Sequence, residues 1–554
     1  MSQLLDETRR AQRGRPLRQV PGVPEEPSEL PVELTVPQRH DLIDLWCQLM
    51  TDVYVHYEQK KALYGYDPVR ALLALRRQIP YLDSASFLRE LTLVINRLRD
   101  QHTQLYLPGS DPRRTPYVAT LPFLVEVYGG YRTPTYVVTK VSDSVDDEDF
   151  VPGVRVTTWN GIPFSRAIDL YADTLTGGRP DARRARALET MTQRPLAFLP
   201  QPDELWVDIG YRNPTTGDGP DRTIRFEWRA VEPSTALTAP DMVELRTRRA
   251  VDATSETARR ARKLLFQPEL WQQETTRRER VAKAAAWMQT AFPDAISARK
   301  LPTSHGIIGY LRLWTFDVDH SDQFLDELNR VLRAMPRRGL IIDLRSNPGG
   351  VIEVAERLLQ LFTTKVIQPV RFALRATPAI AALAEADGNG ADLADWAASV
   401  RTAMDLGEEY SQHLPISDPD RCNGHPVAYR GPVVAVVNAN TFSSGDIFAA
   451  GIADHGIGQI VSIGEGTGAG GANVWTNDDI EYAYHVAGLP LPPRPPGIGY
   501  SLSVRRVARS GTAAGLAIED IGVPGEEHYT MTERDVLNGN EDLTEFCARL
   551  LTAT

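Results

Sequence analysis

Ser443 stands at a position where hydrolytic enzymes place a nucleophile. It lies in a polar turn, Asn438 to Asp446, that follows the apolar, β-branched run Val433 to Val437 and precedes a helical pattern beginning at Ile447. The run predicts a buried strand, and the turn then lifts the serine hydroxyl onto the first turn of a helix. Free N–H groups and the positive end of the helix dipole favour negative charge that develops there, as acyl transfer requires.

Simpler roles exist for the same residues. Ser443 and Asp446 have the spacing of a helix-capping pair, and Asp446 by itself is expected to be an acid at a helix start. Ser444, one residue along, is a rival nucleophile. The assignment of Ser443 therefore depends on whether the rest of the chain supplies a base, an orienting group and oxyanion donors.

His102 is the candidate base. It follows the amphipathic run Phe87 to Leu98 and belongs to the segment Arg99-Asp100-Gln101-His102-Thr103. An acid two residues before a histidine can hold its imidazole in one tautomer, which is what a general base needs. An exposed or capping histidine is the simpler alternative at this position.

Two further features complete the set of parts. Gly349 and Gly350 follow a predicted buried strand, Gly339 to Leu344, and Glu519 precedes a late Gly522. Adjacent glycines after a strand can offer backbone N–H groups, and a carboxylate can orient a histidine. Three nearby groups are expected to be structural instead: the pair Asp343 and Arg345, which would shape the loop, and the histidines His305 and His455.

No cofactor or metal is predicted. Gly466, Gly468 and Gly471 match a dinucleotide-binding fingerprint after a strand, but the residues that follow, Ala472 to Asn477, are not helical, so a substrate-lining loop is the better interpretation. Zinc-protease, EF-hand and P-loop patterns are missing from the sequence.

The order of patterns along the chain predicts five parts. A β-α-β-α alternation near the end implies an α/β fold with a partly parallel sheet, whose active site should lie at the carboxyl ends of the strands. The parts are a flexible arm (1–30), a helical region with His102 (31–112), a β-rich module (113–232), a charged helical connector (233–300), and the α/β core (301–554) with an insertion at 370–428 expected to be a lid or substrate wall.

Charge and composition exclude other classes of protein. The net charge of −11 argues against a nucleic-acid partner, and the three scattered cysteines argue against a disulfide framework. No apolar run is long enough to span a membrane, and the N-terminus lacks a signal-peptide core. A cytoplasmic location is therefore expected.

Two stretches resemble the signature blocks of the C-terminal processing (tail-specific) serine proteases. They are residues 339–350, ending in Asn347-Pro348-Gly349-Gly350, and residues 441–449, which contain Ser443. The resemblance implies a crotonase/ClpP-like peptidase core, and it implies that the β-rich module is PDZ-like and captures an extended peptide by strand addition.

The resemblance also separates two catalytic branches. The processing proteases pair their serine with a lysine 25 residues later, where this chain has Gly468, and no lysine follows Lys365. The tricorn core protease branch instead uses a histidine before the PDZ-like module and a glutamate after the serine. The blocks Asp100 to Thr103 and Glu519 to Pro524 resemble those of that branch.

Carried over, this resemblance assigns a role to each candidate. Ser443 would be the nucleophile, His102 the general base and acid, and Glu519 the orienting carboxylate. The oxyanion hole would consist of the backbone N–H groups of Ser444 and of Gly349 or Gly350. Tricorn-type enzymes carry a serine beside the histidine where this chain has Gln101. Two arrangements are therefore expected: either Gln101 bridges the histidine and the glutamate, or Glu519 or Asp100 meets the imidazole directly.

The expected function is that of a serine peptidase acting on peptide or protein substrates. Assembly into a homo-oligomer is compatible with this expectation. Two alternatives from other classes remain open: a non-catalytic binding protein on the same fold, and an acyl hydrolase or thioesterase.

Overall fold

The computed structural model describes residues 14–19, 33–106, 117–196, 198–199, 201–214, 221–231, 249–266, 287–386 and 393–553. Most of the predicted flexible arm lies outside these ranges, as do parts of the predicted connector, 233–300. Within the arm, β1 (Arg15–Pro16) pairs with β11 (Arg229–Val231).

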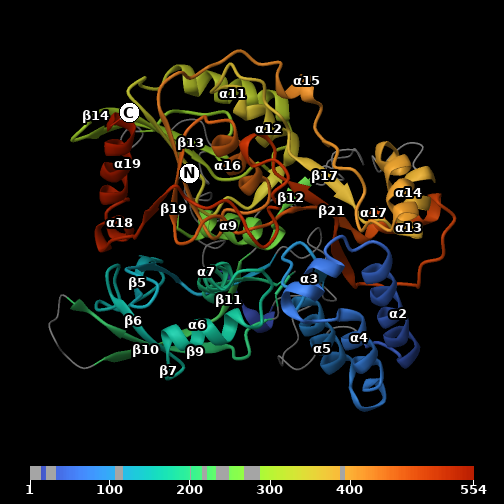
Figure 1. The fold of residues 1–554 in the computed structure, drawn as a ribbon. Helices are drawn as coiled ribbons and strands as arrows, with labels where there is room; N and C mark the ends of the chain where they lie inside the picture. The colour runs from blue at the N-terminus through green and yellow to red at the C-terminus, as the bar shows by residue number, and fades with distance from the viewer. Residues whose placement is uncertain are drawn as a thin grey trace.

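A helical region follows β1 in the described chain (Figure 1). It contains α2 (Val36–Asp52), α3 (Tyr57–Tyr64), α4 (Pro68–Arg76) and α5 (Ser84–Asn96). The apolar side chains spaced three and four residues apart in α2 and α5 are buried, as predicted. Ser84 and Ser86 are of a residue type that suits an N-cap, but Asp83 caps α5 by accepting a hydrogen bond from the Ser86 amide at 2.7 Å.

The β-rich part has its own hydrophobic core, which gathers Phe123, Phe150 and Phe226. Its larger sheet has the order β10 (Arg222–Glu227), β9 (Trp206–Arg212), β6 (Arg155–Trp159), β5 (Thr135–Val141) and β4 (Phe123–Tyr128). A smaller sheet joins β1, β11, β3 (Val118–Thr120) and β8 (Gln193–Pro195). The module also includes α6 (Phe164–Ala172) and α7 (Pro180–Met191).

The α/β core is built on a largely parallel sheet. Its order is β13 (Ile296–Thr303), β14 (Gly306–Leu313), β15 (Leu340–Asp343), β18 (Val433–Asn438), β19 (Gln459–Ile463) and β22 (Glu527–Tyr529), and only the β13–β14 pair is antiparallel. The strands predicted at Gly339 to Leu344 and at Val433 to Val437 are confirmed as β15 and β18.

Helices pack on both faces of this sheet because its strands are apolar on both sides. On one face, Ile342, Ala435 and Val437 share a core with α11 (Ser321–Arg333), α12 (Ile352–Leu359) and α16 (Ser444–Asp454). On the other face, Ile341 and Val434 pack against α19 (Glu541–Ala553).

A second sheet joins distant parts of the chain. Its central strand β21 (Gly499–Ala508) pairs with β17 (Arg371–Leu374), β20 (Ala472–Thr476) and β2 (Gln104–Tyr106). The first residues of the predicted insertion 370–428 therefore belong to a core sheet. The remainder contains α13 (Pro378–Ala386), α14 (Ala397–Leu406) and α15 (Pro419–Cys422).

The loops that carry the candidate residues meet because β15 and β18 are parallel neighbours. The amide of Phe442 donates to the Asn347 carbonyl oxygen at 2.9 Å, which ties the turn before Ser443 to the loop before Gly349. Beyond that loop, β16 (Gly349–Val351) pairs with β12 (Arg249–Val251).

Membrane-spanning character is not found in the described part of the chain, where none of the helices has the necessary combination of length and apolar side chains.

Gly350 is a position at which a side chain cannot be accommodated. A Cβ atom there would lie 2.0 Å from the carbonyl carbon of Phe316, and the residue has a φ of +144°. We expect Gly350→Ala to destabilise the protein by on the order of 3 kcal/mol, measured as a lower thermal unfolding temperature. Gly130→Ala is the matched control, because the nearest atom to its added Cβ is 3.9 Å away. Equal unfolding temperatures for the two variants would contradict the expectation.

Candidate active site

Ser443 occupies a strained turn between β18 and α16. Its backbone has φ 62° and ψ −120°, and its side chain makes no capping hydrogen bond to α16. A positive φ is costly for a residue with a side chain and persists only where the surroundings enforce it. The capping alternative is therefore wrong for this serine, whose hydroxyl is directed elsewhere.

The hydroxyl of Ser443 meets the imidazole of His102. The distance from Oγ to Nε2 is 2.8 Å, and both residues are buried. The two residues are 341 positions apart in the sequence. The ring of His102 also packs on Phe442, with centroids 4.7 Å apart. The structure thus brings together the predicted nucleophile and the predicted base.

The backbone of His102 is held from both sides. Its amide donates to Asp100 Oδ1 at 2.9 Å, and its carbonyl oxygen accepts from the Ser501 hydroxyl at 2.8 Å. Asp100 Oδ2 in turn accepts from the hydroxyls of Thr103 and Ser503. Asp100 therefore fixes the loop that carries the histidine.

Burial lowers the pKa of His102 to about 4, and the negative charge of Asp100 offsets this only in part. The imidazole is consequently neutral at pH 7 and can accept a proton. Its second nitrogen, Nδ1, has no hydrogen-bond partner among the described residues.

None of the three expected orienting groups makes a hydrogen bond to Nδ1. Gln101 Nε2 donates instead to Asp252, and Asp100 bonds the backbone. Glu519 accepts from Lys60 Nζ at 2.5 Å and from the Gly471 amide at 2.9 Å. The predicted direct contact between Glu519 and the imidazole is not made in this structure.

Lys60 is a site residue that sequence reasoning missed. Its ammonium is buried and donates to Glu519, to Asp520 Oδ1 at 2.6 Å and to the Arg99 carbonyl oxygen at 3.0 Å. Burial raises the pKa of Glu519, and the Lys60 ammonium, 2.5 Å away, opposes that rise and favours the ionised carboxylate. The sequence contains no signal for this role, since Lys60 lies in an ordinary polar helix, α3, beside an exposed Lys61.

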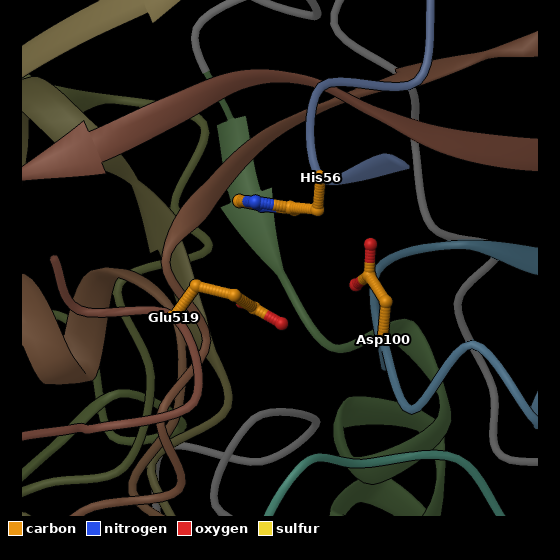
Figure 2. Close-up of side chains that lie close together, drawn as sticks. All are labelled: His56, Asp100 and Glu519. Carbon is orange, nitrogen blue, oxygen red and sulfur yellow. The ribbon is translucent and has the colours of Figure 1, made fainter. Parts of the chain in front are cut away.

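His56 completes a buried cluster with Asp100 and Glu519. Figure 2 shows these three side chains, from three separate segments, directed toward a common space. One potential ligand atom from each lies within 4.8 Å of the others. Neither ring nitrogen of His56 has a partner among the described residues. The cation that bonds Glu519 is the ammonium of Lys60, so the group acts as a charge cluster built around a lysine.

The predicted oxyanion donors differ in their surroundings. The Gly349 amide donates to Asn347 Oδ1 at 2.9 Å, so this N–H group is already engaged and is not an oxyanion donor here. Gly350 lies opposite Ala250 in the β12–β16 pair. Ser444 begins α16, and its hydroxyl donates to the Gly350 carbonyl oxygen at 3.0 Å. The rival nucleophile therefore has a structural contact instead of a base.

Asp446 does more than begin a helix. Its buried carboxylate accepts hydrogen bonds from the amides of Ala469 and Gly470, both at 3.1 Å. Burial raises the pKa of Asp446 to about 7, although these bonds oppose the rise. The carboxylate thereby ties the glycine-rich loop to α16. That loop packs on Phe442, so closely that a Cβ at Gly470 would lie 2.4 Å from the ring.

Asp343, Arg345 and His455 have structural roles, as expected from the sequence. Asp343 is ion-paired with Arg312 and Arg345, which hold the pKa of its carboxyl well below its usual range against the effect of burial. His455 Nε2 accepts from the Gln368 amide at 2.9 Å.

Comparisons with known proteins agree with this geometry. Residues 307–486 match the model of peptidase family S41. The chain is 33% identical over 86 residues to the carboxy-terminal processing protease CtpB of Bacillus subtilis (strain 168), a match that covers 16% of this chain and 17% of that protein.

The fold as a whole is similar to that of mature CPAF. The TM-score is 0.64 at 16% identity, covering 93% of this chain and 97% of the CPAF chain. CPAF complexed with lactacystin gives a TM-score of 0.63 over 94% of this chain and 99% of that one. Residues 307–486 thus match a family of serine proteases, and the fold over most of the chain is similar to that of CPAF.

Proposed function

We propose that this protein is a serine peptidase that hydrolyses peptide bonds in peptide or protein substrates. The observation that carries the proposal is the 2.8 Å contact between Ser443 Oγ and His102 Nε2. The match of residues 307–486 to the model of peptidase family S41 supports the same reaction class. Because the S41 relative CtpB matches over only 17% of its length, the activity of this chain is inferred from its own geometry.

The proposed reaction has two steps. His102 Nε2 takes the proton of Ser443 Oγ as that oxygen attacks the scissile carbonyl carbon, and the imidazolium then protonates the leaving amine. Water attacks the resulting ester with His102 again as the base. The amide of Ser444 is the proposed oxyanion donor, since Ser444 begins α16 and the positive end of the helix dipole favours negative charge there. Ser443 is buried, so substrate entry requires part of its cover to move.

Asp100 and Glu519 are proposed to stabilise the imidazolium by their charge. Asp100 is the stronger candidate, because its carboxylate raises the pKa of His102 more than any other neighbouring group. Glu519, held by Lys60, adds negative charge within the same cluster. Both carboxylates act in a buried site, where charge interactions are stronger than in water.

The finer architecture is proposed on the same basis. The core would be of the crotonase/ClpP type, and residues 113–232 would serve as a PDZ-like module that captures an extended peptide by strand addition. The five-stranded path from β10 to β4 supplies strands at both edges that such a peptide can pair with.

Ser443→Ala should abolish peptide hydrolysis, with a loss of at least about 10³-fold, since the nucleophile is removed. Labelling by a fluorophosphonate should disappear in parallel, because that reagent needs an activated serine. Ser444→Ala is the control and should still be labelled. Thioester hydrolysis without peptide hydrolysis would favour the acyl hydrolase alternative, and absence of labelling in the unaltered protein would favour a non-catalytic binder.

The acid limb of kcat/KM should lie near pH 4, well below the value of 6.5 for an ordinary histidine. The base must be neutral, and burial lowers the pKa of His102, so activity is lost only when the pH falls through this lower value. A pH profile on a short peptide measures it. An acid limb at or above pH 6.5 would show that another environment surrounds the imidazole.

Lys60→Met should reduce kcat at pH 7 by roughly 10- to 100-fold, since an unpaired, buried Glu519 takes up a proton and loses its charge. The loss should shrink as the pH is raised, because Glu519 ionises again. Lys61→Met changes the neighbouring lysine, whose side chain is 40% exposed, and it should have little effect on kcat. Similar kcat values for both variants would show that Lys60 does not contribute to catalysis.

A further inference from the structure

Asp252 lies between the two halves of the candidate site. It follows β12 directly, and its side chain is 1% exposed. Its amide donates to the Pro348 carbonyl oxygen at 2.8 Å, immediately before Gly349 and Gly350. The strand pairing of β12 with β16 and this hydrogen bond thus fix the loop on the oxyanion side.

The carboxylate of Asp252 reaches the other half. It accepts a hydrogen bond from Gln101 Nε2, and Gln101 is the residue directly before His102. Both terminal nitrogens of Arg186, on α7 of the β-rich part, also donate to it, and this ion pair is almost completely buried. Two hydrogen bonds from one guanidinium hold a carboxylate in one orientation, in addition to the attraction between the two charges.

Asp252 also caps its own helix, α9 (Ala253–Phe266). Its carboxylate accepts from the amides of Thr254 at 3.1 Å and Ser255 at 3.3 Å, and from the Ser255 hydroxyl at 2.6 Å. These bonds are sufficient for a cap. The contacts to Gln101 and Pro348 are not needed for capping. The side-chain contact to Gln101 leads to the loop that carries His102, and the backbone contact to Pro348 leads to the segment that contains Gly349 and Gly350.

We propose that Asp252 is a positioning residue for hydrolysis: its carboxylate, held by Arg186, sets the His102 loop through Gln101, and its backbone amide anchors this carboxylate to the segment before Gly349 through Pro348. The proposal rests on the proposed function and extends it to a residue in the connector. It also gives Gln101 a role, which is to join the histidine loop to Asp252 instead of to the imidazole.

Electrostatics support this placement. Besides Asp100, the charges that act on the His102 imidazole include Asp252, which raises its pKa, and Arg186 and Lys60, which lower it. Loss of the Asp252 charge would leave Arg186 unopposed beside the imidazole. The pKa of His102 should then fall further below its ordinary value.

The test compares Asp252→Asn with a matched variant on the same helix. Asp252→Asn keeps the shape of the side chain and removes its charge, so we expect kcat to fall by roughly 10- to 100-fold with KM changed less than about twofold. The control is Glu256→Gln, which breaks a buried ion pair with Arg259 in α9 but touches neither loop. It should lower the unfolding temperature and leave kcat within about twofold.

A second variant covers the case in which Asp252→Asn does not fold. Gln101→Ala keeps the Arg186 pair and the helix cap, so the unfolding temperature should change little while kcat falls. The proposal is overturned if kcat is unchanged in Gln101→Ala or Asp252→Asn, or if Glu256→Gln loses kcat to the same extent as Asp252→Asn.

A measurement independent of activity separates this proposal from the assignment of Ser443. With isotope-labelled histidine, the His102 ring resonance is identified by its loss in His102→Gln and is titrated against pH. Asp252→Asn should shift that titration to lower pH, and Glu256→Gln should not. An unshifted titration in Asp252→Asn overturns the proposal, and a shifted titration supports it. Both conclusions hold even if Ser443 proves not to be the nucleophile.

Discussion

The pairing of β2 with β21 is the contact on which the site depends. Gln104 lies opposite Ser501 in this pair, so a short strand from the N-terminal helical region becomes part of a sheet in the core. Ser501 and Ser503 of β21 then bond the His102 carbonyl oxygen and Asp100, respectively. These bonds span about 400 residues, and they tie the segment that carries the imidazole to the core sheet.

Docking of the helical region also creates an unusual electrostatic environment. Lys60, Asp100, Glu519 and Asp520 are all removed from water at this junction, and burying charges is costly unless they are paired and hydrogen-bonded. The cost is offset by close pairing, as in the 2.5 Å contact from Lys60 to Glu519. The same burial makes His102 a neutral base, so the charge cluster and the catalytic chemistry have one physical origin.

Several elements could be predicted because their signals are local. The apolar run before Ser443 and the strand before Gly349 appear as β18 and β15, with their carboxyl ends adjacent as a parallel sheet requires. One prediction is confirmed but incomplete, because Asp446 lies in the first turn of α16 as predicted and also has a second role. Asp446 resembles an acid at a helix start, yet its carboxylate holds the loop at Ala469 and Gly470, because a short side chain buried beside free amides accepts from them.

The sequence alone determined the elements and the chemical types: a serine lifted onto a helix start, a histidine after a helix, and glycines after a buried strand. Only the tertiary structure decided which side chains meet. It placed His102 on Ser443, engaged Gly349 with Asn347, turned Gln101 to Asp252, and paired Glu519 with Lys60. Strand and helix signals come from neighbours in the sequence, whereas the partner of a buried charge is chosen by packing between segments hundreds of residues apart, and no local pattern encodes that choice.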